Sequence, residues 1–391
     1  MAPSASAAAA LAGELGIATE NTAKWLHEAA EAPGRLAGAA RLRALAEALP
    51  GHLSSSVTEA AAANEAEAER WRLHAGEQLA VDEAGLASTL DRLATQAREA
   101  GGKLLLVGDW AQQGATGPGG AFSILAEDRA DPPELLEARR FQEAWERAAS
   151  TGLRRGSPAD VHEYLRHGRV SAGDKEEVLL GCYEGWRDDV AKGKASLMIA
   201  QDNETVTELN RLARAGRVAA DEVEEGDLAL ADGSVARVGD VVAARKNDRK
   251  LQLPDGAWVR NRDRFVVTAT NDDGSMAVRP VDGGGEVLLP ATYVAEHVAL
   301  GYATTAFSSE GRTVTTAHAV VGAAMTREAL YVAATRGRES NKLYVDVEPE
   351  LSGAKSSHGQ PERLSARHVL RFCEARGREN RRLGRLALQF Q

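Results

Sequence analysis

The stretch that decides the fold reads LAVDEAG at residues 79–85 and LLLVGDWAQQ at residues 104–113. Each segment begins with a short apolar run and ends in polar residues, and a helical spacer separates the two. This pattern predicts two buried parallel strands of an α/β sheet. In such sheets the functional groups lie beyond the carboxyl ends of the strands.

The polar residues after these strands suit the chemistry of a nucleoside triphosphate. Asp82 is placed to hold Mg²⁺ through water, and Glu83 is placed to orient the attacking water. Gln112, in the Gly-Asp-x-x-Gln segment, is placed to sense the γ-phosphate. The structural alternative is that an Asp-Glu pair begins a helix, where its charge meets the macrodipole. Taken together, the two segments favour the catalytic interpretation.

Composition indicates a multidomain protein. The chain has 391 residues, of which 43% are hydrophobic, enough for a large core and two or more domains. No apolar run approaches the roughly 20 residues of a membrane span, and the alanine-rich start lacks the basic region of a signal peptide. We therefore expect a cytoplasmic protein.

The two cysteines, Cys182 and Cys373, are too far apart in sequence to indicate a disulfide framework or a metal site.

The net charge of −10 argues against a generally basic nucleic-acid binder. It does not exclude a local positive groove.

Periodicity and turn residues divide the remainder of the chain. Helices are expected over residues 5–15, 30–75, 148–169 and 204–214, with a cap segment at 19–25 and a buried strand at 197–200. A glycine-rich loop follows at 114–120. From about residue 226 to 290, short alternating segments between Asp-Gly and Gly-Gly turns predict a small β-barrel inserted into an α/β domain.

Five ordered segments resemble motifs II to VI of superfamily 1 DNA helicases. They are Asp82-Glu-Ala-Gly85, Gly108-Asp-Trp-Ala-Gln112, Arg139-Arg-Phe141, Gly301-Tyr-Ala-Thr-Thr305 with Gly311-Arg-Thr313, and Leu330-Tyr-Val-Ala-Ala-Thr-Arg336. The nearest branch is similar to the RecD-like helicase region of MobF-type conjugative relaxases. That branch also shows the Ala-Pro-Ser and Thr-Glu-Asn-Thr-Ala-Lys-Trp segments that occur here at residues 2–4 and 19–25.

The resemblance implies an α/β fold with two RecA-like domains of the P-loop NTPase type, the first incomplete. It also implies an SH3-like β-barrel inserted into the second. The implied ranges are 1–129 for the incomplete first domain with motifs Ia to III, 130–225 for the start of the second with motif IV, 226–292 for the barrel, 293–348 for the end of the second domain with motifs V and VI, and 349–391 for a basic helical tail.

The resemblance implies roles for the nucleotide site. Asp82 and Glu83 keep the Mg²⁺ and water-activating roles, and Gln112 would couple the γ-phosphate to DNA. From the second domain, Arg140 and Arg336 would reach the phosphates of ATP as arginine fingers.

The resemblance also implies that Gly311 binds the nucleotide. Arg139 stays an alternative to Arg140. An ordinary surface ion pair is the alternative for Arg336 taken alone.

Single-stranded DNA is the implied partner. The resemblance assigns it to Ser4, Thr22 and Lys24 in the first domain and to Thr305 in the second, with mostly phosphate contacts and base stacking. Helix capping is the simpler account of Ser4 and Thr22. The basic turns of the predicted barrel either contact DNA or face water.

The chain departs from the family pattern in three places. No P-loop segment, Gly-x-x-x-x-Gly-Lys-Ser/Thr, which would cradle the phosphates, occurs in the sequence, so we expect the chain to begin just after it. Motif V has Phe307-Ser-Ser-Glu310 where the family usually has His, a basic residue, a small residue and Gln, and we expect Glu310 to repel DNA phosphates. Arg262 replaces a common glycine.

The sequence thus predicts a truncated helicase region of a conjugative relaxase, involved in single-stranded DNA translocation and plasmid transfer. ATP and Mg²⁺ are the implied cofactors, and other conjugation or relaxosome proteins are further implied partners. We expect no independent ATP hydrolysis. Two alternatives stay open: a non-catalytic single-stranded DNA-binding or recruitment module, and a working helicase whose P-loop lies in an upstream segment.

Overall fold

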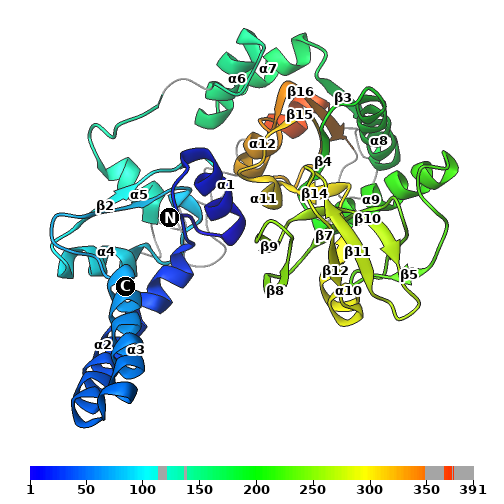
Figure 1. The fold of residues 1–391 in the computed structure, drawn as a ribbon. Helices are drawn as coiled ribbons and strands as arrows, with labels where there is room; N and C mark the ends of the chain where they lie inside the picture. The colour runs from blue at the N-terminus through cyan, green and yellow to red at the C-terminus, as the bar shows by residue number, and fades with distance from the viewer. Residues whose placement is uncertain (113–120, 136–138, 348–364, 372, 374–391) are drawn as a thin grey trace, which may run out of the picture. The chain divides into compact units, whose positions relative to one another are not determined.

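The computed structural model describes residues 1–112, 121–135, 139–347, 365–371 and 373. The chain divides into two compact units (Figure 1). The first unit comprises Met1–Trp110 and Gly114–Ala130, and the second comprises Ala111–Gln113 and Asp131–Gln391. Among the helices in these described ranges, none is both long and apolar enough to cross a membrane.

The first unit combines a small parallel sheet with helices. Its elements are α1 (Ala5–Leu15), α2 (Thr22–Ala48), α3 (Gly51–Arg70), β1 (Gln78–Val81), the 3₁₀ helix η1 (Ala84–Leu86), α4 (Leu90–Glu99), β2 (Lys103–Leu106) and α5 (Ala121–Asp128). The predicted parallel pairing is confirmed, with Leu79 opposite Leu104. The helical layer expected over 30–75 is a pair of long helices, α2 and α3, that lie side by side (Figure 1). Pro50, which lacks an N–H donor, separates them.

Burial differs between the two strands of the first unit. Leu79 and Val81 of β1 are buried in a core with Leu26 and Leu93. By contrast, Leu105 of β2 is 45% exposed. The prediction of two buried strands is therefore wrong for the second. In the described part of the first unit the sheet contains β1 and β2 alone, so one edge of β2 has no neighbouring strand.

We predict that substitutions on these two strands differ sharply in effect. Leu79→Gln places an amide in the core and should lower the free energy of unfolding by about 3 kcal/mol. Leu105→Gln should change it by less than about 0.5 kcal/mol, and should reduce aggregation by interrupting an exposed apolar strand. Urea unfolding and light scattering of both variants measure this. Equal destabilisation by the two substitutions would contradict the burial described.

The second unit contains a parallel sheet. Its surrounding elements are α6 (Ala144–Arg155), α7 (Pro158–Arg166), β3 (Val170–Gly173), α8 (Lys175–Ala191), β4 (Ser196–Ala200), α9 (Asn203–Ala219), β14 (Ala303–Thr305), α11 (Ala306–Ser309), β15 (Val314–Val321), α12 (Arg327–Ala333) and β16 (Gly337–Asp346). The strand order is β14-β4-β15-β16-β3, and all pairs are parallel. The predicted strand at 197–200 is confirmed as β4, which is buried along its whole length.

Helices cover both faces of this sheet. Met198 and Ala200 of β4 pack into one core with α8 and α9. Leu197 and Ile199, on the opposite face, pack into a second core with residues of α6, α7 and α12. The alternation follows from the two-residue period of a strand.

Short antiparallel strands fill the region that the sequence predicted to be β-rich. They are β5 (Leu228–Ala229), β6 (Val235–Ala236), β7 (Val241–Ala244), β8 (Asp248–Gln252), β9 (Trp258–Val259), β10 (Arg264–Thr270), β11 (Met276–Pro280) and β12 (Val287–Leu289), followed by α10 (Ala291–His297) and β13 (Val298–Leu300). Five of them form a sheet in the order β12-β11-β10-β7-β13, and β8 and β9 pair separately. The sheet thus includes β13, beyond the range expected from sequence.

Two helix predictions need correction. The single helix expected over 148–169 is wrong, because Gly156 takes a left-handed conformation (φ 69°) that ends α6, and Ser157 begins α7. The helix expected over 204–214 is longer, since α9 extends to Ala219.

Two further predictions fall largely on undescribed residues. The loop at 114–120 lies outside the described residues. Of the tail at 349–391, residues 365–371 and 373 are described, and Val369 and Leu370 pack into the core beside α6 and α12.

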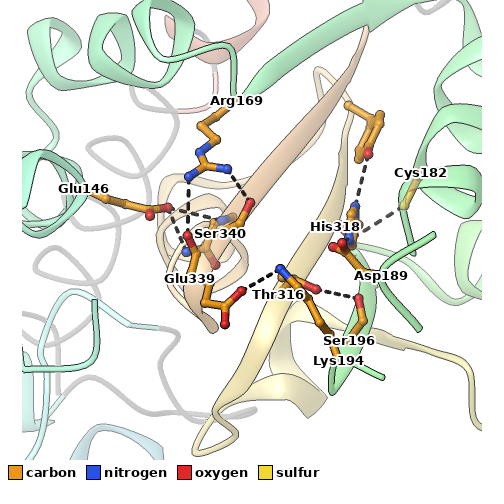
Figure 2. Close-up of polar contacts among 12 residues, drawn as sticks. Glu146, Arg169, Cys182, Asp189, Lys194, Ser196, Thr316, His318, Glu339 and Ser340 are labelled. Atoms are coloured by element: carbon orange, nitrogen blue, oxygen red, sulfur yellow. Dashed lines mark hydrogen bonds and ion pairs between the residues drawn. The ribbon is translucent and has the colours of Figure 1, made fainter. Parts of the chain in front are cut away.

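A buried polar network lies between α8 and the parallel sheet (Figure 2). The His318 ring lies 3.0 Å from Asp189 Oδ2 through Nε2 and 3.0 Å from the Tyr344 hydroxyl through Nδ1. A Cβ at Gly185 would lie 2.3 Å from that hydroxyl, so glycine is required for α8 to approach. Burial lowers the pKa of His318 to about 4, although the Asp189 carboxylate acts in the opposite direction.

We predict that this network makes the second unit sensitive to acid. His318 has a lower pKa folded than unfolded, so its contribution is fully present above the unfolded value near 6.5 and is lost as the pH falls toward 4. At about 1.4 kcal/mol per pKa unit, the full shift corresponds to roughly 3 kcal/mol. Urea unfolding at about pH 7.5 and about pH 5 should show a larger loss for the wild type than for His318→Gln. Identical losses would contradict the prediction.

Candidate functional site

The ends of β1 and β2 lie side by side in the first unit. The amide of Val107 donates to the carbonyl of Val81 at 2.8 Å, and the amide of Ala84 donates to the carbonyl of Val107 at 2.9 Å. Gly108 is required at this point, because a Cβ there would lie 3.0 Å from the Ala84 nitrogen. The segment that carries Asp82 and Glu83 is therefore held against the Gly108-Asp109 segment.

Asp82 and Glu83 are both half-buried at this edge. Glu83 takes a left-handed conformation with φ 50°, which a non-glycine residue adopts only where its surroundings impose it. The Asp82 amide donates to the carbonyl of Met1 at 2.9 Å. Burial lowers the pKa of the Met1 ammonium group, and the Asp82 carboxylate acts in the opposite direction. Among the described residues no three His, Cys, Asp or Glu side chains gather as a metal cage. The water-mediated Mg²⁺ role of these carboxylates stays a prediction.

Gln112 follows the buried Ala111 and is itself half-buried. Both residues group with the second unit. The action of Gln112 together with Asp82 stays a prediction.

The two segments predicted to contact DNA in the first unit are brought together. A parallel bridge joins Ala2 to Asn21, and the Thr22 amide donates to the Ala2 carbonyl at 3.0 Å. Ser4 caps α1 by accepting from the amide of Ala7 at 3.1 Å, so its predicted capping role is confirmed. The capping role of Thr22 is wrong, because Asn21 caps α2 and Thr22 is buried just inside the helix.

A groove lined by aromatic and charged residues adjoins Trp25, and the sequence pattern did not predict it. Lys24 forms an ion pair with Glu20 and lies 5.0 Å from the ring centroid of Trp71. Trp25 packs edge-on against Trp71 at 5.9 Å between ring centroids. Trp25 also lines a groove of about 830 Å³ whose charged residues are of both signs, namely Arg70, Arg72 and His74 with Glu69 and Glu77. The Lys-Trp pair at the end of the cap segment was the available signal.

Arg336 is the centre of the candidate site in the second unit. Its side chain is 1% exposed, so the alternative of a surface ion pair is wrong. Nε donates to the carbonyl of Val332 at 2.9 Å, and Nη2 donates to the Thr335 hydroxyl at 3.1 Å. Nη1 lies 3.5 Å from two further carbonyls, those of Ser309 and Arg312. The guanidinium thus joins motif VI to motif V.

Arg140 reaches the same place from motif IV. Its Nη1 donates to the carbonyl of Thr335 at 2.6 Å, next to Arg336 in the chain. Arg139 is exposed, whereas Arg140 is half-buried. The structure therefore brings Arg140 and Arg336 together, although their roles toward a phosphate remain predictions.

Residues 305–312, which we call the motif V turn, carry the remaining predicted residues. Thr305 caps α11 by accepting from the Ser308 amide at 3.1 Å. Gly311 has φ 75° and an open surrounding. Glu310 is 8% exposed. The expected repulsion between Glu310 and DNA phosphates stays a prediction, and within the chain the Glu310 carboxylate acts on the Arg262 guanidinium.

We predict that Arg336 contributes strongly to stability. Arg336→Met removes the donors that satisfy several buried carbonyls, which should cost about 3 kcal/mol of unfolding free energy. Arg139→Met, at an exposed position of the same type, should cost less than about 0.5 kcal/mol. Chemical unfolding measures both. A similar small effect for the two variants would show that the Arg336 guanidinium is not an organising contact.

Residues 1–175 match a family model described as an AAA domain. The chain is 28% identical over 396 residues to a probable conjugal transfer protein TraA of Sinorhizobium fredii (strain NBRC 101917 / NGR234), an alignment that covers 94% of this chain and 35% of that protein. It thus spans about a third of the relative's length.

Two other similarities are shorter or weaker. The uncharacterized protein Rv2311 of Mycobacterium tuberculosis (strain ATCC 25618 / H37Rv) is 33% identical over 130 residues, which cover 33% of this chain and 71% of that protein. A crystal structure of Pif1 helicase from Bacteroides in complex with ADP-AlF3 and ssDNA superposes with a TM-score of 0.44 and 17% identity, over 69% of this chain and 70% of that chain.

Proposed function

This chain belongs to the same protein family as Rv2311 of Mycobacterium tuberculosis, and from this premise and its similarity to TraA we propose that it is the helicase region of a conjugal DNA-transfer protein. The proposed region is of the superfamily 1, RecD-like type found in MobF relaxases. Its substrates would be single-stranded DNA and ATP with Mg²⁺, and other conjugation proteins would be its partners. Similarity to the TraA protein over 94% of the chain supports this proposal.

The convergence of motifs IV, V and VI carries the proposal. Arg140 bonds the carbonyl that precedes Arg336, and Arg336 reaches the motif V turn. These segments are far apart in sequence and were assigned separately. Their meeting supports one common task, which in this family type is the response of the second domain to the nucleotide phosphates.

The first unit would contribute two carboxylates to the proposed nucleotide site. Asp82 and Glu83 stand at the tip of β1 and suit a Mg²⁺-bound water. The P-loop sequence that would hold the phosphates does not occur in these 391 residues. We therefore propose that this chain by itself does not hydrolyse ATP, since the carboxylates act only on a nucleotide already held in place.

A second candidate function is single-stranded DNA binding without catalysis. The β8–β9 hairpin favours it, because the guanidinium groups of Arg249 and Arg260 lie 4.9 and 5.2 Å from the ring centroid of Trp258. Cationic groups beside an aromatic ring suit a strand of DNA through phosphate contact and base stacking. The helicase proposal includes this surface, so ATP dependence separates the two functions.

We predict that the purified chain binds a fluorescent oligothymidylate and releases no phosphate from ATP. Trp258→Ala should weaken DNA binding roughly tenfold, as expected for loss of one stacking contact. Arg279→Ala changes an exposed arginine on β11 and serves as the matched control. Fluorescence anisotropy over a range of salt concentrations measures affinity, because phosphate contacts weaken as salt rises.

Restoration of the P-loop separates the two functions. The experiment fuses a strand and P-loop segment of a superfamily 1 helicase, with the sequence Gly-x-x-x-x-Gly-Lys-Ser/Thr, ahead of Met1. DNA-stimulated ATP hydrolysis that Glu83→Gln abolishes would support the helicase. DNA binding without any hydrolysis in the fusion would support the binding module, and absence of DNA binding would contradict both.

A further inference from the structure

Two departures from the helicase motif pattern meet in space. Arg262 stands where the family commonly has glycine, and Phe307 and Glu310 stand where motif V usually has His and Gln. The Arg262 guanidinium lies 4.7 Å from the ring centroid of Phe307, and its Nη1 is 3.4 Å from the Phe307 carbonyl. The segments that contain Arg262 and Phe307 are therefore in direct contact.

Arg262 is held in an unfavourable backbone conformation. Its φ of 76° is one that glycine adopts readily and a residue with a long side chain rarely adopts. Its amide donates to the carbonyl of Ala244 at 2.8 Å, and its carbonyl accepts from Arg312 Nη2. The surroundings on β7 and on the motif V turn thus impose a conformation that the residue itself disfavours.

The charges around Arg262 form a compensated set. Burial lowers the pKa of Arg262, and the Glu310 carboxylate acts in the opposite direction. Burial also lowers the pKa of Arg312, an effect that Asp263 and Asp282 oppose and to which the like charge of Arg262 adds. Glu310 and Arg262 therefore offset each other where water is largely excluded, and loss of either would leave the other poorly compensated.

The motif V turn is held from a second side by Arg336. The carbonyls of Ser309 and Arg312 accept from Arg336 Nη1. The side chain of Arg312 bonds the backbone of Arg262, and the carbonyl of Arg312 bonds Arg336. The turn thus stands between a residue of the antiparallel-sheet region and the candidate phosphate-sensing arginine.

We propose that Arg262 is a positioning residue that sets the location of the Arg336 guanidinium by clamping the motif V turn against the antiparallel-sheet region. The inference rests on the proposed function, in which Arg336 is the residue that responds to the bound nucleotide. In a chain of this kind, a ligand that shifts the antiparallel sheet would move Arg336 through this turn. Glycine at position 262 would allow the same backbone path without the clamp.

Arg262→Gly tests the clamp, because glycine relieves the backbone conformation while the side-chain contacts are lost. In the full chain, hydrogen exchange of residues 305–312 followed by mass spectrometry should be roughly tenfold faster in the variant, as expected for a weakened local structure. Phenylglyoxal modification of Arg336, which is protected by burial in the wild type, should rise as well. Arg262→Lys restores the positive charge and should recover part of both effects.

Arg279→Ala is the matched control, and exchange of β4 should stay unchanged in all variants. Unchanged exchange of residues 305–312 in Arg262→Gly would overturn the clamp. Faster exchange there with no change at Arg336 would overturn the positioning role. Neither readout needs DNA or nucleotide, so failure of the proposed function would leave this result standing, and failure of the clamp would leave DNA binding to be judged separately.

Discussion

A guanidinium withdrawn from water must have its donors satisfied, and this requirement organises the candidate site of the second unit. Arg336 meets it with carbonyls from its own helix end and from the motif V turn. Because an unpaired buried charge is costly, separation of the motif V turn from the end of α12 would be destabilising. Arg140 adds a third segment through the carbonyl of Thr335. The parallel sheet supplies the frame, since β15 and β16 pair in parallel and both begin at this region, with Val314 opposite Gly337.

Charge at this site has to be considered in pairs. Glu310, taken by its sequence position alone, is an anion where DNA phosphates were expected. In the folded chain it is buried and faces Arg262. Arg262 and Glu310 thus belong to one local arrangement. A buried anion and a buried cation together change the local charge little, whereas either alone would be destabilising.

The sequence predicted what depends on local pattern. The parallel pairing of β1 and β2, the buried strand β4 and the short antiparallel strands follow from apolar period and turn residues. Which of two neighbouring residues caps a helix, and where a helix ends, depended on tertiary context. Asn21 caps α2 instead of Thr22, and Gly156 ends a helix whose apolar pattern continued. The exposure of Leu105 depends on which strands flank β2, and the contact of Arg262 with Phe307 joins residues 45 positions apart. Neither is visible in a local window.

The central claim is that Arg336 is a fixed, internally bonded guanidinium that joins motif VI to the motif V turn. Its Nε–H proton reports this directly in an NMR spectrum of the chain labelled with ¹⁵N-arginine, with Arg336→Lys assigning the resonance. The account predicts a resolved Nε–H signal that exchanges slowly with D₂O, because the donor is buried against the Val332 carbonyl. A signal that exchanges as rapidly as those of exposed arginines would contradict the account.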